Sequence, residues 1–441
     1  MQPQQRSMTI IAPVVRGREQ SLKDLLTSIG RDIEGNTHIQ FARFPNIHFA
    51  RWAVIPSSSP QDSSGPPSLL AFGTDHDGPD ETLIRDAVGG AIDALDAIYS
   101  HCESWPGPGD RGRAAAYFLS RRIPYGARHI ACRGRTVQQL KDAVAAHGRM
   151  EAYVDAVVRP ARANRGEALD AQAAAHEIAA IRKGASPIPS ISGPPPNWQL
   201  PLILMGVVGA VGGGLFLLGR RSPVLGLLGA ASLVCLGKAA VDLLHRHEAA
   251  DWGVNGEKWK ETTPPTLDHL RELRVWEDHK VQNQMTHVVP VKPGRFRRVT
   301  LNVVLAAIDL LARFKWNQGD LGGIPTIHFA RWMLIEGGDR LLFFSNFDGS
   351  WENYLGDFVD RASEGLTGVW SNTVEFPPTH NLIKEGSKQA EAFKNWTRKY
   401  QIETQVWYSA YPDVTVVNQR DALRLCQVPT RGAEKDLLGA L

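Results

Sequence analysis

The sequence is poor in cysteine, and its few cysteines do not form a recognisable site. The four cysteines, Cys102, Cys132, Cys235 and Cys426, are scattered over 441 residues. No CxxC pair and no Cys/His spacing of the kind that holds zinc occurs among them. We therefore expect neither a disulfide framework nor a structural zinc site.

The chain also lacks an excess of charge of either sign. It has 49 Lys and Arg against 46 Asp and Glu, which gives a formal net charge of +3. A balance this even provides no extended positive field for a phosphate backbone, so a nucleic-acid partner is not expected. With 43% hydrophobic and 22% charged residues, the composition is that of a globular protein, and the length predicts two or three domains.

The motifs of several common enzyme classes are missing. The sequence has no Walker loop, no GxGxxG after a strand, no GxSxG and no HExxH. Nucleotide-driven chemistry and the standard hydrolase classes are therefore not indicated. The first twenty residues do not show a basic stretch followed by an apolar one, so we expect no secretory signal and a cytoplasmic N-terminal part.

Two long apolar runs stand in the middle of the chain. Residues 200–219, LPLILMGVVGAVGGGLFLLG, carry no charge and are long enough to cross the hydrocarbon of a bilayer as a helix. After a pair of arginines, residues 223–244 form a second run that is apolar except for Lys238 and Asp242. The two runs predict a transmembrane helical hairpin over residues 200–245, and the alternative is a buried hairpin in a soluble protein.

Stretches rich in Pro and Ser flank the predicted hairpin and mark the domain boundaries. We predict a first module over residues 1–183, a Pro/Ser-rich linker over 184–199, the hairpin over 200–245, a linker with a short helix over 246–284, and a second module over 285–441. The positive-inside tendency favours a cytoplasmic hinge for the hairpin, which conflicts with a cytoplasmic N-terminal module. The sequence leaves that conflict open.

The two modules repeat one another in sequence. MTIIAPVVRGR at residues 8–18 corresponds to MTHVVPVKPGR at residues 285–295, with Met, Thr, Pro, Val, Gly and Arg in register. PNIHFARWAVI at residues 45–55 corresponds to PTIHFARWMLI at residues 325–335, where the six residues IHFARW are identical. Two matches in the same order predict that both modules share one fold.

Hydrophobic periodicity predicts the elements of that fold. In the first module, a strand over residues 8–15 precedes an amphipathic helix, two β-rich runs, further helical sequence and a final strand over residues 127–132. The order βαββαβ is that of the ferredoxin-like arrangement, which is an α+β fold. The chain is thus predicted to be two tandem ferredoxin-like modules separated by the hairpin.

Each module resembles the dimeric α+β barrel superfamily in its opening strand with a Pro-Val-x-x-Gly-Arg exit, followed by a helix and a β-hairpin. That superfamily includes antibiotic-biosynthesis-type monooxygenases, chlorite dismutases and dye-decolorizing peroxidases. The resemblance implies that the two modules pair sheet to sheet, on one side of the membrane. It makes haem a candidate cofactor, although no residue of this sequence matches an iron ligand of the family.

The shared IHFARW segment and the strand after it supply the candidate catalytic residues. Strict alternation places His48, Ala50 and Trp52 on one face of their strand. A histidine held by a carboxylate suits a general base, a haem ligand or a proton shuttle, and an arginine polarises peroxide or anchors a carboxylate. In the alternative interpretation, each aspartate caps the helix that follows it, and the other residues have structural partners. The candidates are His328, Arg331, Asn346 and Asp348 in the second module, and His48, Arg51 and Asp77 in the first.

Aromatic residues concentrate in the second module, which predicts an apolar pocket there or, alternatively, an aromatic core. We expect a membrane-anchored oxidoreductase of the peroxidase or monooxygenase type that acts on an apolar or lipid-derived small molecule, with cytoplasmic modules. The alternative is a non-catalytic membrane-anchored scaffold or ligand-binding protein. In a third hypothesis the hairpin serves a membrane assembly through Lys238 and Asp242. The expected partners are the lipid bilayer, an apolar ligand and a second copy of the chain.

Overall fold

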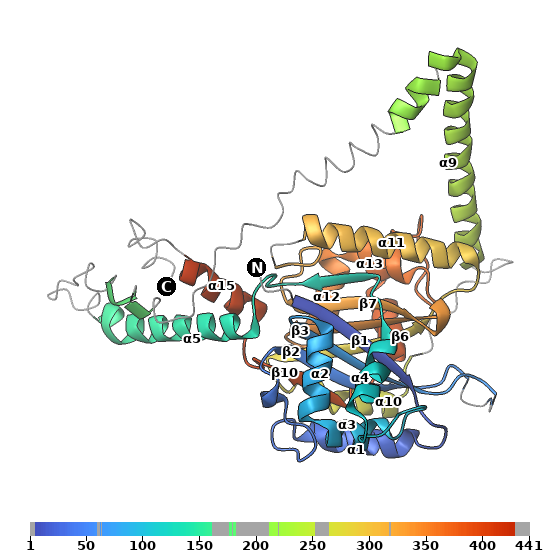
Figure 1. Ribbon diagram of the computed structural model, residues 1–441. Helices are drawn as coiled ribbons and strands as arrows, with labels where there is room; N and C mark the ends of the chain where they lie inside the picture. Colours follow the sequence, from blue (N-terminus) through green and yellow to red (C-terminus); the bar gives the residue numbers. More distant parts are fainter. Residues whose placement is uncertain are drawn as a thin grey trace.

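The protein has a mixed α+β fold with two five-stranded antiparallel sheets, as the sequence predicted for its fold class. The computed structural model describes residues 5–59, 62, 64–160, 176–178, 180–181, 211–218, 220–251, 264–316 and 319–427. Figure 1 shows the two sheets stacked face to face, with helices on their outer sides. The described structure is therefore one layered body from which one arm and one long helix project.

Each sheet contains strands from both halves of the chain. The first sheet has the order β10-β2-β3-β1-β4, and the second has the order β5-β7-β8-β6-β9. The strands of the first sheet are β1 (Gln5–Pro13), β2 (Ile47–Ile55), β3 (Leu69–Asp77), β4 (Arg122–Ile123) and β10 (Val406–Ser409). Those of the second are β5 (Ala127–Ile130), β6 (Gln282–Pro290), β7 (Ile327–Ile335), β8 (Arg340–Asp348) and β9 (Gln401–Ile402).

The two halves of the chain exchange one strand each. β5 belongs to the first half but pairs with β7, with Ala127 opposite Trp332. β10 belongs to the second half but pairs with β2, with Val406 opposite Trp52. The prediction that residues 127–132 form the last strand of the first module's own sheet is therefore wrong, because the two-residue strand β4 takes that place beside β1.

A proline and a glycine allow this exchange. Pro124 directly follows β4 and has no N–H to continue the ladder with β1. The chain then crosses to the other sheet, where the N–H of Gly126 donates to the carbonyl of Trp332 at 2.8 Å. A Cβ at Gly126 would lie 2.8 Å from a methyl of Leu305, so a side chain at this crossing would require Leu305 to shift.

The helices cover the outer faces of the sheets through apolar stripes at helical spacing. On the first half, Leu22, Leu26 and Ile29 of α1 are fully buried against the sheet. On the second half, Leu301 and Leu305 of α11 have the same role. The covering helices are α1 (Glu19–Arg31), α2 (Asp80–Gly90), α3 (Ile92–Tyr99) and α4 (Arg111–Ser120) in the first half, and α11 (Arg295–Phe314), α12 (Trp351–Arg361), α13 (Ser363–Trp370) and α14 (Ala390–Tyr400) in the second.

Two further helices form an arm at one end of the body. α5 (Val137–Tyr153) follows β5, and α15 (Val416–Gln427) follows β10, so they occupy corresponding places in the two halves. They pack along each other, and Figure 1 shows them projecting beyond the sheets. α10 (Leu267–Arg274) is the short helix predicted within residues 246–284.

One described helix, α9 (Pro223–Asp251), has the length and composition to cross a membrane. Its large apolar side chains are exposed, among them Leu227 at 76% and Val234 at 72%. Most of the first apolar run, residues 200–210 and Gly219, lies outside the described residues. Residues 211–218 are helical, and a Cβ at Gly229 of α9 would contact Leu215 and Leu218 from that segment.

We expect Gly73→Ala to destabilise the stacked sheets, because the new Cβ would lie 2.5 Å from Nη2 of Arg331 and 2.7 Å from the ring of Phe344. Overpacking of this kind costs about 1–3 kcal/mol. Chemical denaturation of the purified chain measures the change. Gly89→Ala in α2 is the control, because its Cβ meets nothing within 4 Å, so a gain of about 0.5 kcal/mol is expected there. Equal effects at both positions would contradict this account of the sheet packing.

Candidate functional site

The seven predicted site residues all lie on β2, β3, β7 and β8, in the layer between the two sheets. Six of them are buried, and the seventh, Asp77, has a side chain that is 13% exposed. They do not form one cluster. They form two His–Asp pairs beneath the arm and, next to these, a network around the two arginines.

A β-bulge changes which residues share a face of β2. The pairing of β2 with β3 shifts register between Ile47 and Phe49, and β7 shifts at the corresponding place. Ala50 and Trp52 belong to the core beneath the helices. His48 contacts rings of the layer between the sheets, including Phe329 at 5.3 Å. The prediction that His48 shares a face with Trp52 is therefore wrong, because the bulge interrupts the alternation.

Each histidine is held by the aspartate of the neighbouring strand. His48 Nε2 lies 3.1 Å from Asp77 Oδ1, and His328 Nε2 lies 2.7 Å from Asp348 Oδ1. The proximity predicted for His328 and Asp348 is thus present. With Nε2–H donating to the carboxylate, Nδ1 of His48 accepts from the Tyr411 hydroxyl at 2.9 Å.

The second oxygen of each aspartate caps a helix of the arm. Asp77 Oδ2 accepts from the Val137 N–H at 2.9 Å, and Asp348 Oδ2 accepts from the Val416 N–H at 2.7 Å. Val137 and Val416 are the first residues of α5 and α15, where helix N–H groups have no partner within the helix. The aspartates therefore do cap helices, but those of the arm; the helix directly after Asp348 is capped by Ser350 instead.

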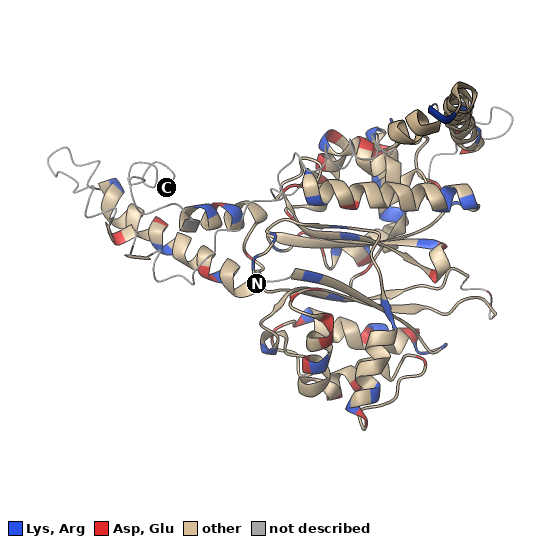
Figure 2. Cartoon of the chain, turned by 45° about the horizontal axis from the view of Figure 1, so that its top comes forward, with Lys and Arg blue, Asp and Glu red and all other residues tan. Residues whose placement is uncertain are grey.

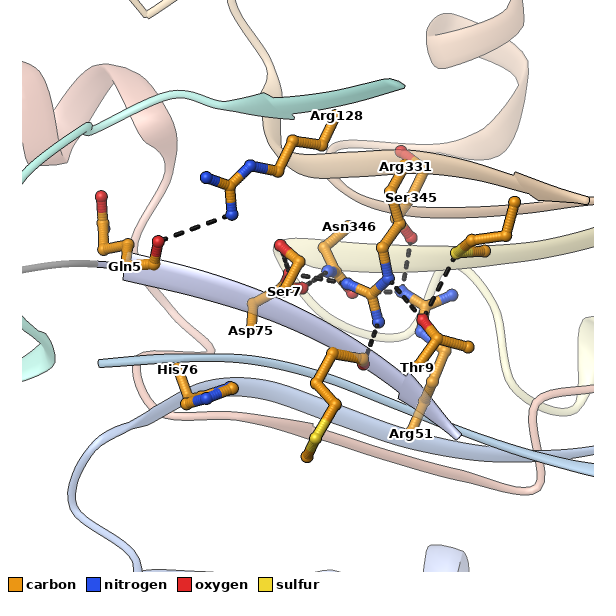
Figure 3. Close-up of polar contacts among 12 residues, drawn as sticks. Gln5, Ser7, Thr9, Arg51, Asp75, His76, Arg128, Arg331, Ser345 and Asn346 are labelled. Carbon is orange, nitrogen blue, oxygen red and sulfur yellow. Dashed lines mark hydrogen bonds and ion pairs between the residues drawn. The ribbon is translucent and has the colours of Figure 1, made fainter. Parts of the chain in front are cut away.

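The two arginines reach across to opposite sheets, as Figure 3 shows. Arg51 on β2 donates to the carbonyl of Met285 at 2.7 Å and to that of Ser345 at 2.8 Å, and it also donates to the Asn346 side chain. Arg331 on β7 donates to the carbonyl of Met8 at 3.3 Å, which corresponds to the Met285 carbonyl in the repeat. Both guanidinium groups lie over the ring of Phe344, at 4.8 and 5.2 Å from its centroid.

The network holds two positive charges against a single carboxylate. Arg331 forms an ion pair with Asp75 at 2.6 Å, and both side chains are at most 3% exposed. Asn346 stands where the repeat has Asp75, and its amide donates to Asp75 at 3.3 Å. Burial and then the charge of Arg331 lower the pKa of Arg51 to about 9, although Asp75 opposes this.

Two further residues contact the predicted ones. The sequence offered Thr74 or Asp75 as the counterpart of Asn346, and the structure assigns Asp75; the sequence did not place Tyr411 at the site. Asp75 is recognisable once β3 and β8 are aligned, because it then falls opposite Asn346 in the repeat. Tyr411 follows the exchanged strand β10, and its contact with His48 joins residues 363 positions apart. No local pattern in the sequence signals such a contact.

Cavities lie beneath the helices of each half. The first half has an apolar cavity of about 40 Å³ beside Trp52 and Phe72. The second half has a wider cleft of about 530 Å³, bounded by α11, the end of α12 and the start of α13. Among the described residues, no group of three His, Cys, Asp or Glu side chains is placed to hold a metal ion.

His287 on β6 is a further buried histidine, enclosed by aromatic rings. Its ring lies 5.0 Å from that of Trp370 and 4.8 Å from that of Trp396, and neither ring nitrogen has a hydrogen-bond partner among the described residues. Burial lowers the pKa of His287 to about 3, so the ring is neutral at ordinary pH. The cavity beside it holds about 10 Å³.

No protein-family model, no curated protein and no solved structure matches this chain. A function for the protein therefore has to be inferred from the geometry of its own residues.

We expect Asp75→Asn to destabilise the protein strongly, because Arg331 would lose its ion-pair partner and the network would lose the carboxylate that offsets the charges of both arginines. Removing one partner of a buried pair costs about 3–5 kcal/mol. Urea denaturation at neutral pH provides the measurement. Asp268→Asn is the matched control, since its ion pair with Arg271 is exposed and such pairs contribute about 0–1 kcal/mol. A loss below that range for Asp75→Asn would show that the network is not what joins the sheets.

We expect His287 to make the protein less stable at acidic pH. Its pKa in the folded chain, about 3, is below the ordinary value of 6.5, so the unfolded chain takes up a proton first as the pH falls. Stability is lost as the pH falls below about 6.5, by about 2 kcal/mol for this group at pH 5. His287→Ile, which copies Ile10 of the first half, is expected to have a shallower pH dependence in urea denaturation.

The exposed His38 supplies the control, because His38→Asn removes a ring that is already in contact with water. Its pH dependence is expected to match that of the unmodified protein. If His287→Ile retains the full acid dependence, the neutral buried imidazole is not its source.

Proposed function

We propose that this chain is a membrane-anchored binding protein whose two halves form one fused pair, and that a cleft in its second half binds an amphiphilic, lipid-derived molecule. The cleft of about 530 Å³ carries this proposal. Its size is within the range of about 300–1,000 Å³ that small-molecule sites occupy.

The sheet order supports the predicted relation to tandem ferredoxin-like modules. In each half the long first strand lies between the third strand and a short edge strand, with the second strand beyond the third. The face-to-face stacking of the sheets is the pairing that the resemblance to the dimeric α+β barrel superfamily implies. Fold alone does not imply a function, so the resemblance adds no activity.

The exposure of α9 supports the membrane anchor. A helix that is apolar all round and exposed to solvent is not stable in water, whereas the apolar part of α9 is long enough to cross a bilayer. Both halves belong to one stacked body, so a chain that crosses at α9 must cross once more before it. The run at residues 200–219 is long enough for that second crossing, and Leu215 and Leu218 lie so close to α9 that a Cβ at Gly229 would touch both. A transmembrane hairpin provides both crossings and leaves the two halves on the same side of the membrane.

The lining of the cleft determines the class of ligand. Trp316 and Trp332 provide an aromatic wall, and the indole N–H of Trp332 has no hydrogen-bond partner among the described residues. Lys315, Arg361 and Lys388 add positive charge to the lining, and Asp360 and Glu364 add negative charge. An apolar chain with a hydrogen-bond-accepting head, such as a fatty acid, fits this lining. The chain packs on the aromatic wall, and the head accepts from the unpaired indole N–H and pairs with one of the basic side chains.

A haem-dependent oxidoreductase has less support. His48, Arg51, His328 and Arg331 are at most 3% exposed and are bonded to neighbours within the sheet layer. The cavity of about 10 Å³ at His287 is far too small for haem. The residues that line the cleft of about 530 Å³ include no His, Cys, Met or Tyr to bind iron. A second cleft, of about 540 Å³ beside Asp348, has Tyr354 in its lining, but the Tyr354 hydroxyl donates to Ser345 at 2.6 Å. These sites therefore do not fit haem, and the binding function is preferred to a peroxidase or monooxygenase.

We expect the detergent-purified chain to show no Soret absorption and to bind a brominated fatty acid that quenches its tryptophan fluorescence. Gly365→Trp should weaken this binding by about tenfold or more, because Gly365 faces Trp316 across the cleft and a new indole would fill it. Gly148→Trp, at an exposed and open position on α5, is the control and should bind normally. A Soret band, or equal binding by both variants, would overturn the proposal.

A further inference from the structure

The C-terminal end of α9 is attached to the second half of the chain by buried polar contacts. Glu248 is buried and accepts from the Thr379 hydroxyl at 3.0 Å and from the Leu382 N–H at 2.9 Å. Asp251 forms ion pairs with Arg297 at 2.6 Å and with Lys292 at 2.8 Å. Contacts of this kind hold a helix in one orientation, so the direction of α9 fixes where a bilayer would lie relative to the body.

The length of the apolar part of α9 indicates where the hydrocarbon layer of the bilayer would end. Residues 223–244 span about 33 Å as a helix, which matches the roughly 30 Å of hydrocarbon in a bilayer. The boundary on the side of the body therefore falls close to Leu244. His247 is three residues further on, about 5 Å along the axis, and its ring stacks on Phe296 at 4.2 Å. The first turn of α11 thus lies next to the boundary.

α11 extends from that point across the body. Figure 1 shows α11 running crosswise to α9, on the side of the body from which α9 leaves, and Figure 2 shows the same relation from a second direction. A bilayer crossed by α9 would therefore face the outer side of α11 along its length. The inner side of α11 packs on the second sheet through Leu301, Leu305 and Ile308.

The outer side of α11 has the composition of a surface that lies on lipid. Val299 and Val303, four residues apart and on one helical face, are 61% and 63% exposed. Ile383 is 45% exposed and adjoins α11, since its methyl group and that of Val304 both lie 3.5 Å from where a Cβ of Gly368 would be. Basic side chains border these apolar ones: Arg295, Arg298, which pairs with Asp339, and Lys384.

We propose that this surface, formed by Val299, Val303 and Ile383 with Arg295, Arg298 and Lys384, lies in the headgroup layer of the bilayer that α9 crosses. The apolar side chains enter the boundary between headgroups and acyl chains, and the basic ones contact anionic headgroups. Apolar residues flanked by basic ones on one helical face are typical of helices that lie in the membrane plane. The inference rests on the proposed membrane anchor.

The arrangement also orients the ligand cleft. Ile308 and Leu311 of α11 line the cleft, so a helix that rests on the bilayer would form one of its walls. The first sheet and its helices would face away from the membrane. An amphiphilic ligand would then pass between the bilayer and the cleft along α11 without crossing water over a long distance.

A depth measurement on the full chain in vesicles of phosphatidylcholine and phosphatidylglycerol tests the proposal. A fluorophore is attached to Val303→Cys, to Asp24→Cys on the exposed side of α1, or to the native Cys235 of α9. Each labelled chain keeps one accessible cysteine, with Cys426 replaced by Ser throughout and Cys235 replaced by Ser for the first two sites. Vesicles with nitroxide-labelled lipids then quench fluorophores that lie in the bilayer.

We expect strong quenching at Cys235 and at Val303→Cys, and several-fold weaker quenching at Asp24→Cys. Adding Arg295→Glu and Lys384→Glu should reduce the quenching at Val303→Cys and leave that at Cys235 unchanged. Quenching at Cys235 with none at Val303→Cys would overturn the surface contact while keeping the anchor. The absence of quenching at Cys235 would overturn the membrane anchor itself.

Discussion

Two arginines buried between two sheets are the constraint on which the rest of this structure depends. Each guanidinium group extends from one sheet and has its acceptors on the other, so neither is satisfied unless the sheets are stacked. A charged group that loses its partners in a buried layer costs several kcal/mol. The two halves therefore behave as one folding unit. Because their sheets are stacked, both halves lie on the same side of any membrane that the chain crosses between them.

The repeat, the fold class and the pairing of His328 with Asp348 were predictable because they depend on patterns within one half. Alternating apolar residues and a close glycine turn identify neighbouring strands, and the IHFARW identity reveals the duplication. The strand exchange was not predictable, because β5 and β10 have four residues each and pair with strands about two hundred or more positions away in sequence. The bulge at His48 and the capping of α5 by Asp77 were not predictable either, because only tertiary contacts determine them.

The differences between the halves are concentrated where the two copies meet or enclose a space. Gly73 corresponds to Phe344, so both arginines lie over one ring, and no second ring collides with it. Asp75 corresponds to Asn346, which avoids two facing carboxylates. Ile10 corresponds to His287 in the aromatic core. Fusion of two copies into one chain allows such positions to differ, whereas two identical subunits would carry the same residue twice. The large cleft beside α11 belongs to the more aromatic half.

The exchanged strands impose an order on how the protein is made. β2 is synthesised early, yet its outer edge is completed only by β10, roughly 350 residues later, which at 5–20 residues per second is a delay of roughly 20 to 70 s. During that interval β2 presents open backbone groups, while the apolar runs in the middle of the chain leave the ribosome. An exposed strand edge is a template for pairing with other nascent chains. Biogenesis of this protein therefore depends on protecting that edge until β10 has been synthesised.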